Sequence, residues 1–315
     1  MAAEMGKRLL AEVEEVGLDE ILHTLRLRHN PDPQYFNLPT LDRLLHTANP
    51  TESNQPQTQP NLELTSHHPG SGTTAFLTHL IALALLPTHH GGKSACVALL
   101  DTDSTFSASR LAQQLRQHLP PSEPASTIET ALTHLHVFRP QSLPSLISTI
   151  ASLPTYLLTK PHPSTHRALA FIALDSATAF NWQARAADED RLFAEQHPQT
   201  QATPPTAPPP AQPTLATALK TATAALAAPL VYTTHSPPAT GIRPTLRLAL
   251  KRNPVRPFPP TYSVTEALRE AGDRQRAVEG SGWEARAIEQ REGRGRGFGF
   301  MISEGGIKLI IDGER

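Results

Sequence analysis

The segment Leu62–Thr74 combines a short apolar stretch with closely spaced glycines and threonines, and a long apolar run follows it. Glycines in such a position let backbone N–H groups face a bound phosphate, and a Ser or Thr hydroxyl that follows can hold magnesium. Gly70, Gly72 and Thr74 stand at the positions that this chemistry needs. The pattern therefore indicates a phosphate-binding loop, with an ordinary glycine-rich turn as the alternative.

This loop departs from the usual pattern at two positions. His67 stands where the first glycine is expected, and Thr73 replaces the lysine that contacts the outer phosphates. A charged hydrogen bond to phosphate contributes roughly 1.5–3 kcal/mol, so its loss weakens binding. Lys93 and Lys220 precede their strands, at the wrong edge of a parallel sheet to replace it. The predicted nucleotide-binding residues are Gly70, Ser71, Gly72, Thr73 and Thr74.

Polar side chains also follow three later apolar runs. Asp101 and Asp103 follow the first run, Asp175 the second and His235 the third. Because parallel strands end at the same edge of a sheet, we expect these groups to lie near the loop. A carboxylate at the end of a strand can hold magnesium, so Thr74 and Asp175 are the predicted magnesium-side residues. The alternative for each acid alone is a structural cap.

The elements that must position these groups alternate between strand and helix. Apolar runs predict strands at 62–64, 96–100, 135–138, 168–174 and 230–232, and helical spacing predicts helices at 74–86, 106–119, 143–158 and 215–227. This alternation predicts an α/β fold with a doubly wound, mostly parallel sheet. We expect an edge strand at 245–250, charged and partly helical residues at 263–291, and a C-terminal β-hairpin at 298–311.

The chain divides into two parts by composition. Residues 1–37 are expected to hold an amphipathic helix at 4–27 and a linker, and residues 38–315 the core. The 31 prolines concentrate in part in a segment at about 196–214, which predicts an extended or disordered insertion. No internal repeat is visible.

Charge and cysteine content exclude several classes of protein. The net charge is −1, so no overall field attracts polyanions. The single cysteine, Cys96, cannot form an intrachain disulfide, which favours an intracellular protein. The run Leu80–Leu86 is too short to span a bilayer, and no membrane partner is expected.

Histidine is frequent, with 15 copies, and this raises the question of a metal site. His67–His68 and His89–His90 are adjacent pairs and lack the i, i+4 spacing of a helical zinc site. We therefore expect no zinc.

Several motifs together resemble the RecA-like recombinases, and among them the eukaryotic recombinase paralogues of homologous recombination. The resemblance covers most of residues 38–310, and its pattern is most similar to the X-ray-repair cross-complementing group-two paralogues, in a divergent form. The segments that carry it are Leu41–Leu45, the loop through Thr74, Leu100–Phe106, Ser109–Ala112, Ser152–Leu158, Leu174–Trp182, Val231–His235 and Gly299–Lys308.

The resemblance implies a RecA-like P-loop NTPase core and a role for each matched residue. It makes Asp175 the magnesium-side acid. Asp103 stands where active recombinases carry the glutamate that polarises water, and His235 stands where they carry a glutamine that senses the γ-phosphate. These two residues are the candidate catalytic positions. Because both differ from the active pattern and Thr73 replaces the lysine, we expect ATP and magnesium to bind weakly, if at all, and hydrolysis to be inefficient.

The family's DNA-facing loops follow the Asp175 and His235 strands. The first corresponds to residues 185–213, which are acidic and then proline-rich, and this composition is poor for phosphate contact. The second, at 236–256, is basic. It provides the candidate contacts to single-stranded or branched DNA, which are Arg243, Arg247, Lys251 and Arg252. A solvated charged face is the alternative.

The resemblance implies a nuclear subunit that supports double-strand-break repair by assembling with other recombinase paralogues and with the strand-exchange recombinase. Three alternatives stay open: an active ATPase that uses atypical residues, a P-loop kinase or other small-molecule transferase, and a scaffold that binds neither nucleotide nor DNA.

Overall fold

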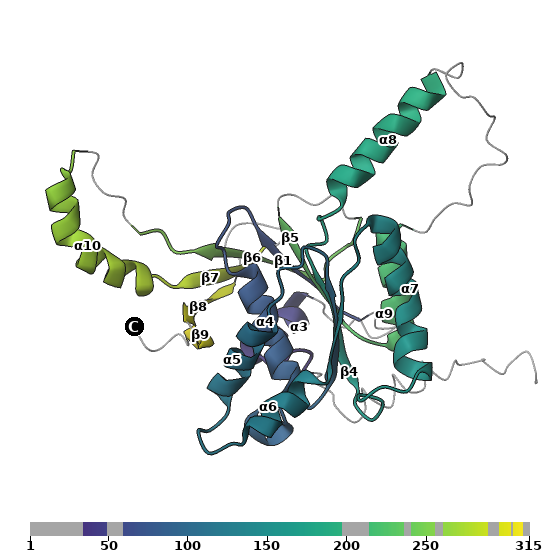
Figure 1. Cartoon of the computed structure of the whole chain (residues 1–315), viewed down its shortest axis with the longest axis horizontal. Coiled ribbons are helices and arrows are strands. Elements are labelled where there is room, and N and C mark those ends of the chain that lie inside the picture. Colours follow the sequence, from purple (N-terminus) through teal and green to yellow (C-terminus); the bar gives the residue numbers. More distant parts are fainter. Residues whose placement is uncertain are drawn as a thin grey trace, which may run out of the picture.

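The protein is represented by a computed structural model, which describes residues 34–48, 59–196, 214–235, 241–255, 261–288, 296–303 and 305–310. Within these residues one mixed sheet forms the centre of the molecule (Figure 1). Its strands are β1 (Asn61–Ser66), β2 (Cys96–Asp101), β3 (Leu135–Phe138), β4 (Leu169–Asp175), β5 (Leu230–His235), β6 (Leu246–Arg252), β7 (Trp283–Ala287), β8 (Gly297–Ser303) and β9 (Gly306–Ile310).

The strand order is β3-β2-β4-β5-β1-β6-β7-β8-β9. The pairs from β3 through β6 are parallel, and the pairs from β6 through β9 are antiparallel. β2, β4 and β5 lie on one side of β1, and β6 lies on the other. The predicted doubly wound, mostly parallel sheet and its C-terminal hairpin are confirmed, and this arrangement is that of a RecA-like core.

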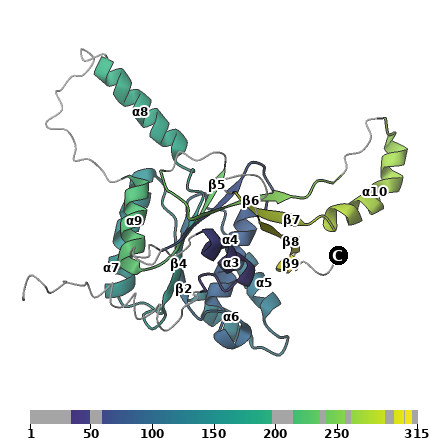
Figure 2. The same cartoon turned by 180° about the vertical axis from the view of Figure 1, so that it is seen from behind.

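Helices cover both faces of the parallel part of the sheet (Figure 1). On one face α4 packs with α3, α5 and α6, and on the other α7 packs with α9. Their bounds are α3 (Pro39–Ala48), α4 (Thr73–Leu85), α5 (Ala108–His118), α6 (Ala125–Leu132), α7 (Leu143–Thr159) and α9 (Leu215–Leu226). The two further helices, α8 (Asn181–Gln196) and α10 (Val264–Glu279), extend away from the sheet in both views (Figure 2).

Alternation along the strands explains why both faces are covered. In β2, Val97 and Leu99 belong to the apolar cluster under α4, whereas Ala98 and Leu100 belong to the cluster under α7. Successive strand residues point to opposite faces, so a strand buried on both sides must be apolar throughout. This is why continuous apolar runs located β2 and β4 correctly in the sequence.

The prediction of an edge strand at 245–250 was wrong. β6 pairs with β1 on one side and with β7 on the other. Its alternating pattern arises from its two faces: Leu246, Leu248 and Leu250 are buried, whereas Arg247 and Ala249 are only partly buried. The alternation of apolar and polar residues in β6 therefore indicates that one face of this strand is less buried than the other. It does not indicate that the strand lies at the edge of the sheet.

Helix α7 confirms the helix predicted at 143–158, although it contains two prolines. It is continuous from Leu143 to Thr159. Pro144 lies in the first turn, where no backbone N–H is needed, and only Pro154 lies inside the helix. The sequence analysis missed α6, and it placed α8 in a loop and β7 in a charged, partly helical stretch.

Some predictions lie outside the described residues. These are the helix at 4–27, most of the proline-rich insertion and parts of the basic stretch at 236–256. The division into residues 1–37 and 38–315 stays a prediction.

Candidate nucleotide-binding site

The phosphate-loop segment joins the end of β1 to the start of α4, at the carboxyl edge of the sheet. Gly70 and Gly72 have φ angles of 75° and 88°, a left-handed conformation that strongly favours glycine. Gly72 caps α4 and has no side chain that could accept a hydrogen bond from the first N–H groups of this helix. The loop therefore presents backbone donors and the positive end of the helix dipole, which suit an anion.

Packing from the C-terminal strands holds this loop. A Cβ atom on Gly72 would lie 2.9 Å from Ile302 Cδ1 and 3.2 Å from Trp283 Cδ1, so a side chain there would displace Ile302 in addition to straining the backbone. The Trp283 indole N–H donates to the Gly70 carbonyl oxygen at 3.0 Å. Strands β7 and β8 therefore brace the loop.

The remaining loop residues lie as the spacing predicts, in one turn. Ser71 and Thr73 are buried, and Thr74 lies in the first turn of α4, where its carbonyl oxygen accepts from the Thr78 hydroxyl at 2.7 Å. No lysine lies within this loop, and Lys93 donates instead to the carbonyl oxygens of Gln34 and Tyr35, 2.9 Å away in each case. The loop thus offers backbone donors and a hydroxyl but no cation.

The strand registers bring the other predicted residues to the same edge. Ser66 is level with His235 across the β1–β5 pair, and Asp101 is level with Asp175 across the β2–β4 pair. His235 is exposed, and its Nδ1 lies 3.2 Å from Ser66 Oγ. Asp103 lies in the exposed bend after β2. The expected convergence on one edge of the sheet is therefore present.

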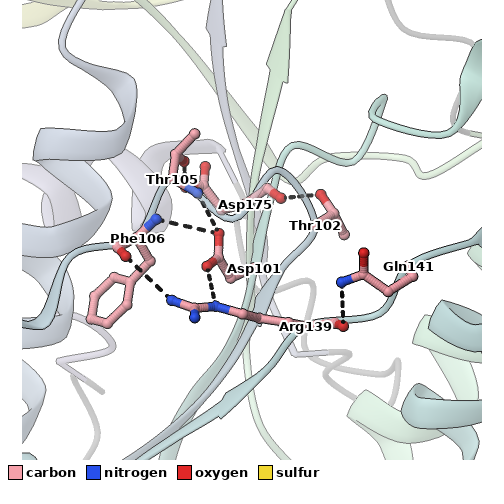
Figure 3. A network of polar contacts seen from close by, with 7 residues as sticks. All are labelled: Asp101, Thr102, Thr105, Phe106, Arg139, Gln141 and Asp175. Atoms are coloured by element: carbon pink, nitrogen blue, oxygen red, sulfur yellow. Dashed lines mark hydrogen bonds and ion pairs between the residues drawn. The ribbon is translucent and has the colours of Figure 1, made fainter.

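Asp175 is buried at the end of β4 (Figure 3). The Thr233 hydroxyl donates to its Oδ1 at 2.7 Å, and the Thr105 hydroxyl donates weakly to its Oδ2 at 3.4 Å. Burial raises the pKa of this carboxyl, the nearby Asp101 and Asp103 raise it further, and the two hydroxyls oppose the shift. A carboxylate in this setting is stabilised by a nearby cation.

Asp101 has a structural role that the sequence did not reveal. It is fully buried, and its Oδ1 accepts from the backbone N–H of Thr105 at 3.0 Å and of Phe106 at 3.3 Å. Its Oδ2 accepts from Arg139 Nε at 3.0 Å (Figure 3). With its acceptor sites filled by protein donors, Asp101 shapes the bend that carries Asp103.

Sequence reasoning also missed a second buried acid, Glu63 in β1. Its side chain is completely buried and accepts from Thr234 Oγ1 at 2.8 Å, from Tyr232 Oη at 3.3 Å and from Arg247 Nε at 2.7 Å. The carboxylate raises the pKa of the Tyr232 hydroxyl above its usual range, with burial as the larger cause. The available signal was a lone acid between Leu62 and Leu64, the two apolar residues of the strand.

The candidate DNA-contacting residues lie on or beside β6, and three of them have protein partners. Arg247 pairs with Glu63, and Lys251 Nζ lies 3.3 Å from Glu284 Oε2. Arg252 lies over the Trp283 ring, with its Cζ 5.0 Å from the ring centroid, and donates to the Val278 carbonyl at 2.9 Å. Arg243 is exposed. Their contact with DNA stays a prediction.

The comparisons with known proteins point to one family. DNA repair protein RAD51 homolog 2 of Homo sapiens is 33% identical over 95 residues, which cover 29% of this chain and 24% of that protein. Its counterpart in Mus musculus is 28% identical over 165 residues, which cover 46% of this chain and 44% of that protein. Over these segments the chain is similar, with divergence, to the RecA-like recombinase paralogues.

This relationship to the recombinase paralogues is partial. The chain spans less than half the length of either relative that it matches. No known family model matches it. The finer assignment to the group-two paralogues stays a prediction, since both matches are to a different paralogue. Among the described helices, none has the length and apolar character needed to cross a bilayer.

Proposed function

We propose that the chain is a nuclear, recombinase-paralogue-like subunit that supports homologous recombination through assembly rather than through efficient ATP hydrolysis. One observation carries this proposal: a RecA-like sheet edge retains the shape of a phosphate loop while its cation is replaced by the buried Thr73. The similarity to two proteins named as DNA repair proteins supports the recombination role.

The residues present fit magnesium better than they fit a full set of phosphate contacts. Thr74 supplies a hydroxyl, and Asp175 supplies a carboxylate whose pKa is raised by burial and by the neighbouring Asp101 and Asp103. When bound, magnesium would neutralise charge on the outer phosphates of ATP. The uncapped start of α4 would hold a phosphate oxygen through backbone N–H groups. We therefore propose weak binding of ATP with magnesium.

The catalytic positions support weak turnover at most. Asp103 is exposed on its bend, and its side chain is one methylene shorter than the glutamate expected there. His235 bonds Ser66 at the end of β5. With no lysine in the loop, charge that develops on the transferring phosphoryl lacks its usual partner. Nucleotide in this site would bias assembly without being consumed.

The candidate DNA-contacting residues differ in whether their side chains already have protein partners. Arg243, Lys251 and Arg252 are exposed, but Lys251 and Arg252, like Arg247, already have protein partners among the described residues. We propose that Arg243 contributes most to any contact with single-stranded or branched DNA. Its replacement by Ala should then weaken DNA binding uniformly across sequences, because it would contact phosphates.

Three measurements test the proposal. Affinity purification of the chain from cells with induced DNA breaks should recover other recombinase paralogues or the strand-exchange recombinase, and recovery of none would contradict the assembly role. Titration with ATP and magnesium should show tighter binding by Thr73→Lys than by the wild type, by about tenfold or more. No gain would show that the loop does not hold phosphate. ATP hydrolysis by the wild type that disappears in Asp175→Ala would instead favour an active ATPase.

A further inference from the structure

A pair of adjacent histidines lies at the far end of the molecule from the nucleotide site. His89 and His90 belong to a 3₁₀ turn, η1 (Thr88–His90), which follows α4. Helix α4 begins at the phosphate loop, and its 13 residues span roughly 20 Å, so η1 lies at the amino edge of the sheet. Backbone hydrogen bonds fix the turn, from His90 N to the Pro87 carbonyl and from Gly91 N to the Thr88 carbonyl, each 3.0 Å long.

A carboxylate from a different loop meets this pair. Glu123 lies in the connection between α5 and α6, and its Oε2 is 3.3 Å from His90 Nε2. The Thr127 hydroxyl donates to the other carboxylate oxygen, Oε1, at 2.8 Å. That bond orients the carboxylate and leaves Oε2 facing the histidine. A hydrogen-bonded partner of this kind is typical of carboxylates that ligate metals.

The spacing of the donor atoms fits a metal ion. His89, His90 and Glu123 each offer one donor atom, and the three atoms lie within 4.8 Å of one another. A tetrahedral zinc ion about 2.0–2.1 Å from its ligands keeps neighbouring donor atoms about 3.4 Å apart. The 3.3 Å separation between His90 and Glu123 is already at that value.

The surroundings of His90 add a second, independent observation. Its Nε2 is shielded from solvent and, among the residues that the structure describes, forms no hydrogen bond of acceptable geometry, although Glu123 lies close to it. A shielded polar nitrogen without a good hydrogen bond is unfavourable, and a metal ion would satisfy it. His89 is exposed beside it, with the two ring centroids 4.1 Å apart, so an ion has access from solvent.

We propose that His89, His90 and Glu123 bind one zinc ion, with water as the fourth ligand. Two imidazoles and one carboxylate are a ligand set that zinc accepts with an open position. The ion would join the α4–β2 connection to the α5–α6 connection, at the edge of the sheet opposite the nucleotide site. The sequence analysis expected no zinc because the histidines are adjacent; the third ligand comes from 33 residues further along the chain. This inference is independent of the proposed function.

The competing explanation is a simple ion pair between protonated His90 and Glu123, with no metal. Calorimetric titration of the metal-free full chain with zinc chloride, against a competing chelator, separates the two. The metal site predicts saturation at one ion per chain. Titration with cobalt chloride should then give the strong visible absorption of four-coordinate cobalt, whereas an ion pair gives neither signal.

Variants locate the site. His90→Asn and Glu123→Gln should each weaken zinc binding by more than about tenfold, and Thr127→Val by about tenfold, since Thr127 only orients the carboxylate. His67→Asn with His68→Asn is the matched control, because that exposed pair has no third ligand among the described residues. Circular dichroism confirms that each variant is folded. Absence of zinc binding by the wild type, or binding lost only in the control, would overturn the proposal.

Discussion

The Trp283 side chain donates its indole N–H to the carbonyl oxygen of Gly70, 213 residues earlier in the chain, at 3.0 Å. The bond joins the first residue of β7 to the phosphate loop, and the same ring lies against Gly72. With its carbonyl held by Trp283, Gly70 keeps the left-handed conformation that the loop requires. The antiparallel end of the sheet thus shapes the nucleotide site.

Replacement of Trp283 by Phe tests this brace. Phenylalanine keeps a six-membered ring but loses the N–H donor and the five-membered ring that lies against Gly72, so the free energy of unfolding should fall by about 1 kcal/mol or more. Binding of ATP should weaken at the same time, because the loop samples other conformations. Urea unfolding and nucleotide titration measure the two effects. Unchanged values for both would show that the hydrogen bond does not hold the loop.

The fluorescence of Trp283 provides a direct signal from the loop. The chain has two tryptophans, and Trp182 is 79% exposed at the start of α8. In a Trp182→Phe background, emission reports on Trp283 alone. Addition of ATP and magnesium should change that emission.

The ion pair between Glu63 and Arg247 makes a sharper prediction about stability. Arg247→Met leaves the fully buried Glu63 without its cation and should lower the free energy of unfolding by about 3 kcal/mol. Chemical denaturation measures the change. The double variant Glu63→Gln with Arg247→Met should recover most of the loss, because no unpaired charge is then buried.

This prediction also separates two roles for basic residues near β6. Arg243→Ala is the matched control, since Arg243 is exposed and its backbone carbonyl, not its side chain, accepts from Asn61. It should leave stability within about 0.5 kcal/mol of the wild type. A stable Arg247→Met variant would contradict the structural role of this arginine.

Much of the fold was visible in the sequence because burial on both faces leaves a continuous apolar run. Continuous apolar runs predicted β2 and β4, and the acid at the end of each run predicted the carboxyl edge of the sheet. β7 was not visible, because its residues alternate between charged and small side chains beside a charged helix. Its place depends on pairing with β6 and β8, which are distant contacts that local pattern does not encode.

The sequence predicted which edge of the sheet carries the site, but it did not predict the contacts of the side chains there. Spacing placed Gly72, Asp103 and Asp175 at one edge, which the registers confirm for the strands that carry them. The sequence could not show that the Asp101 carboxylate accepts hydrogen bonds from protein donors. Nor could it show that Arg247 forms an ion pair with a buried acid on β1. These roles depend on which side chains meet between neighbouring strands, and residue type alone does not predict those contacts.

The buried Asp175 carboxyl makes a prediction that links stability to pH. Its pKa is raised in the folded protein, so the folded state binds a proton more readily than the unfolded chain does. Stability from this group is therefore greatest at low pH and falls as pH rises from the unfolded pKa through the folded one. Asp175→Asn should raise the melting temperature at neutral pH. It should also abolish the effect of magnesium on ATP binding.

Calorimetry of Asp175→Asn and the wild type at several pH values measures this difference. Thr233→Val is the informative partner variant, because Thr233 supplies the hydroxyl that stabilises the charged carboxylate. It should lower stability at neutral pH while Asp175→Asn raises it. A melting temperature of Asp175→Asn that falls below that of the wild type at neutral pH would contradict the assignment.

A buried histidine makes stability depend on pH in the opposite direction to Asp175, so that stability falls as pH falls. His79 in α4 is only 3% exposed, and the Gln114 amide lies 2.8 Å from its Nδ1. Burial and the neighbouring His118 lower the pKa of His79 to about 3. Between the unfolded value of about 6.5 and that value, the unfolded chain binds a proton that the folded state excludes. Stability must therefore fall as pH falls, by about 1.4 kcal/mol per pH unit from this residue.

Denaturation from pH 7 to pH 4 should show this slope, and His79→Asn should flatten it. An equal slope in the variant would assign the acid sensitivity to other groups.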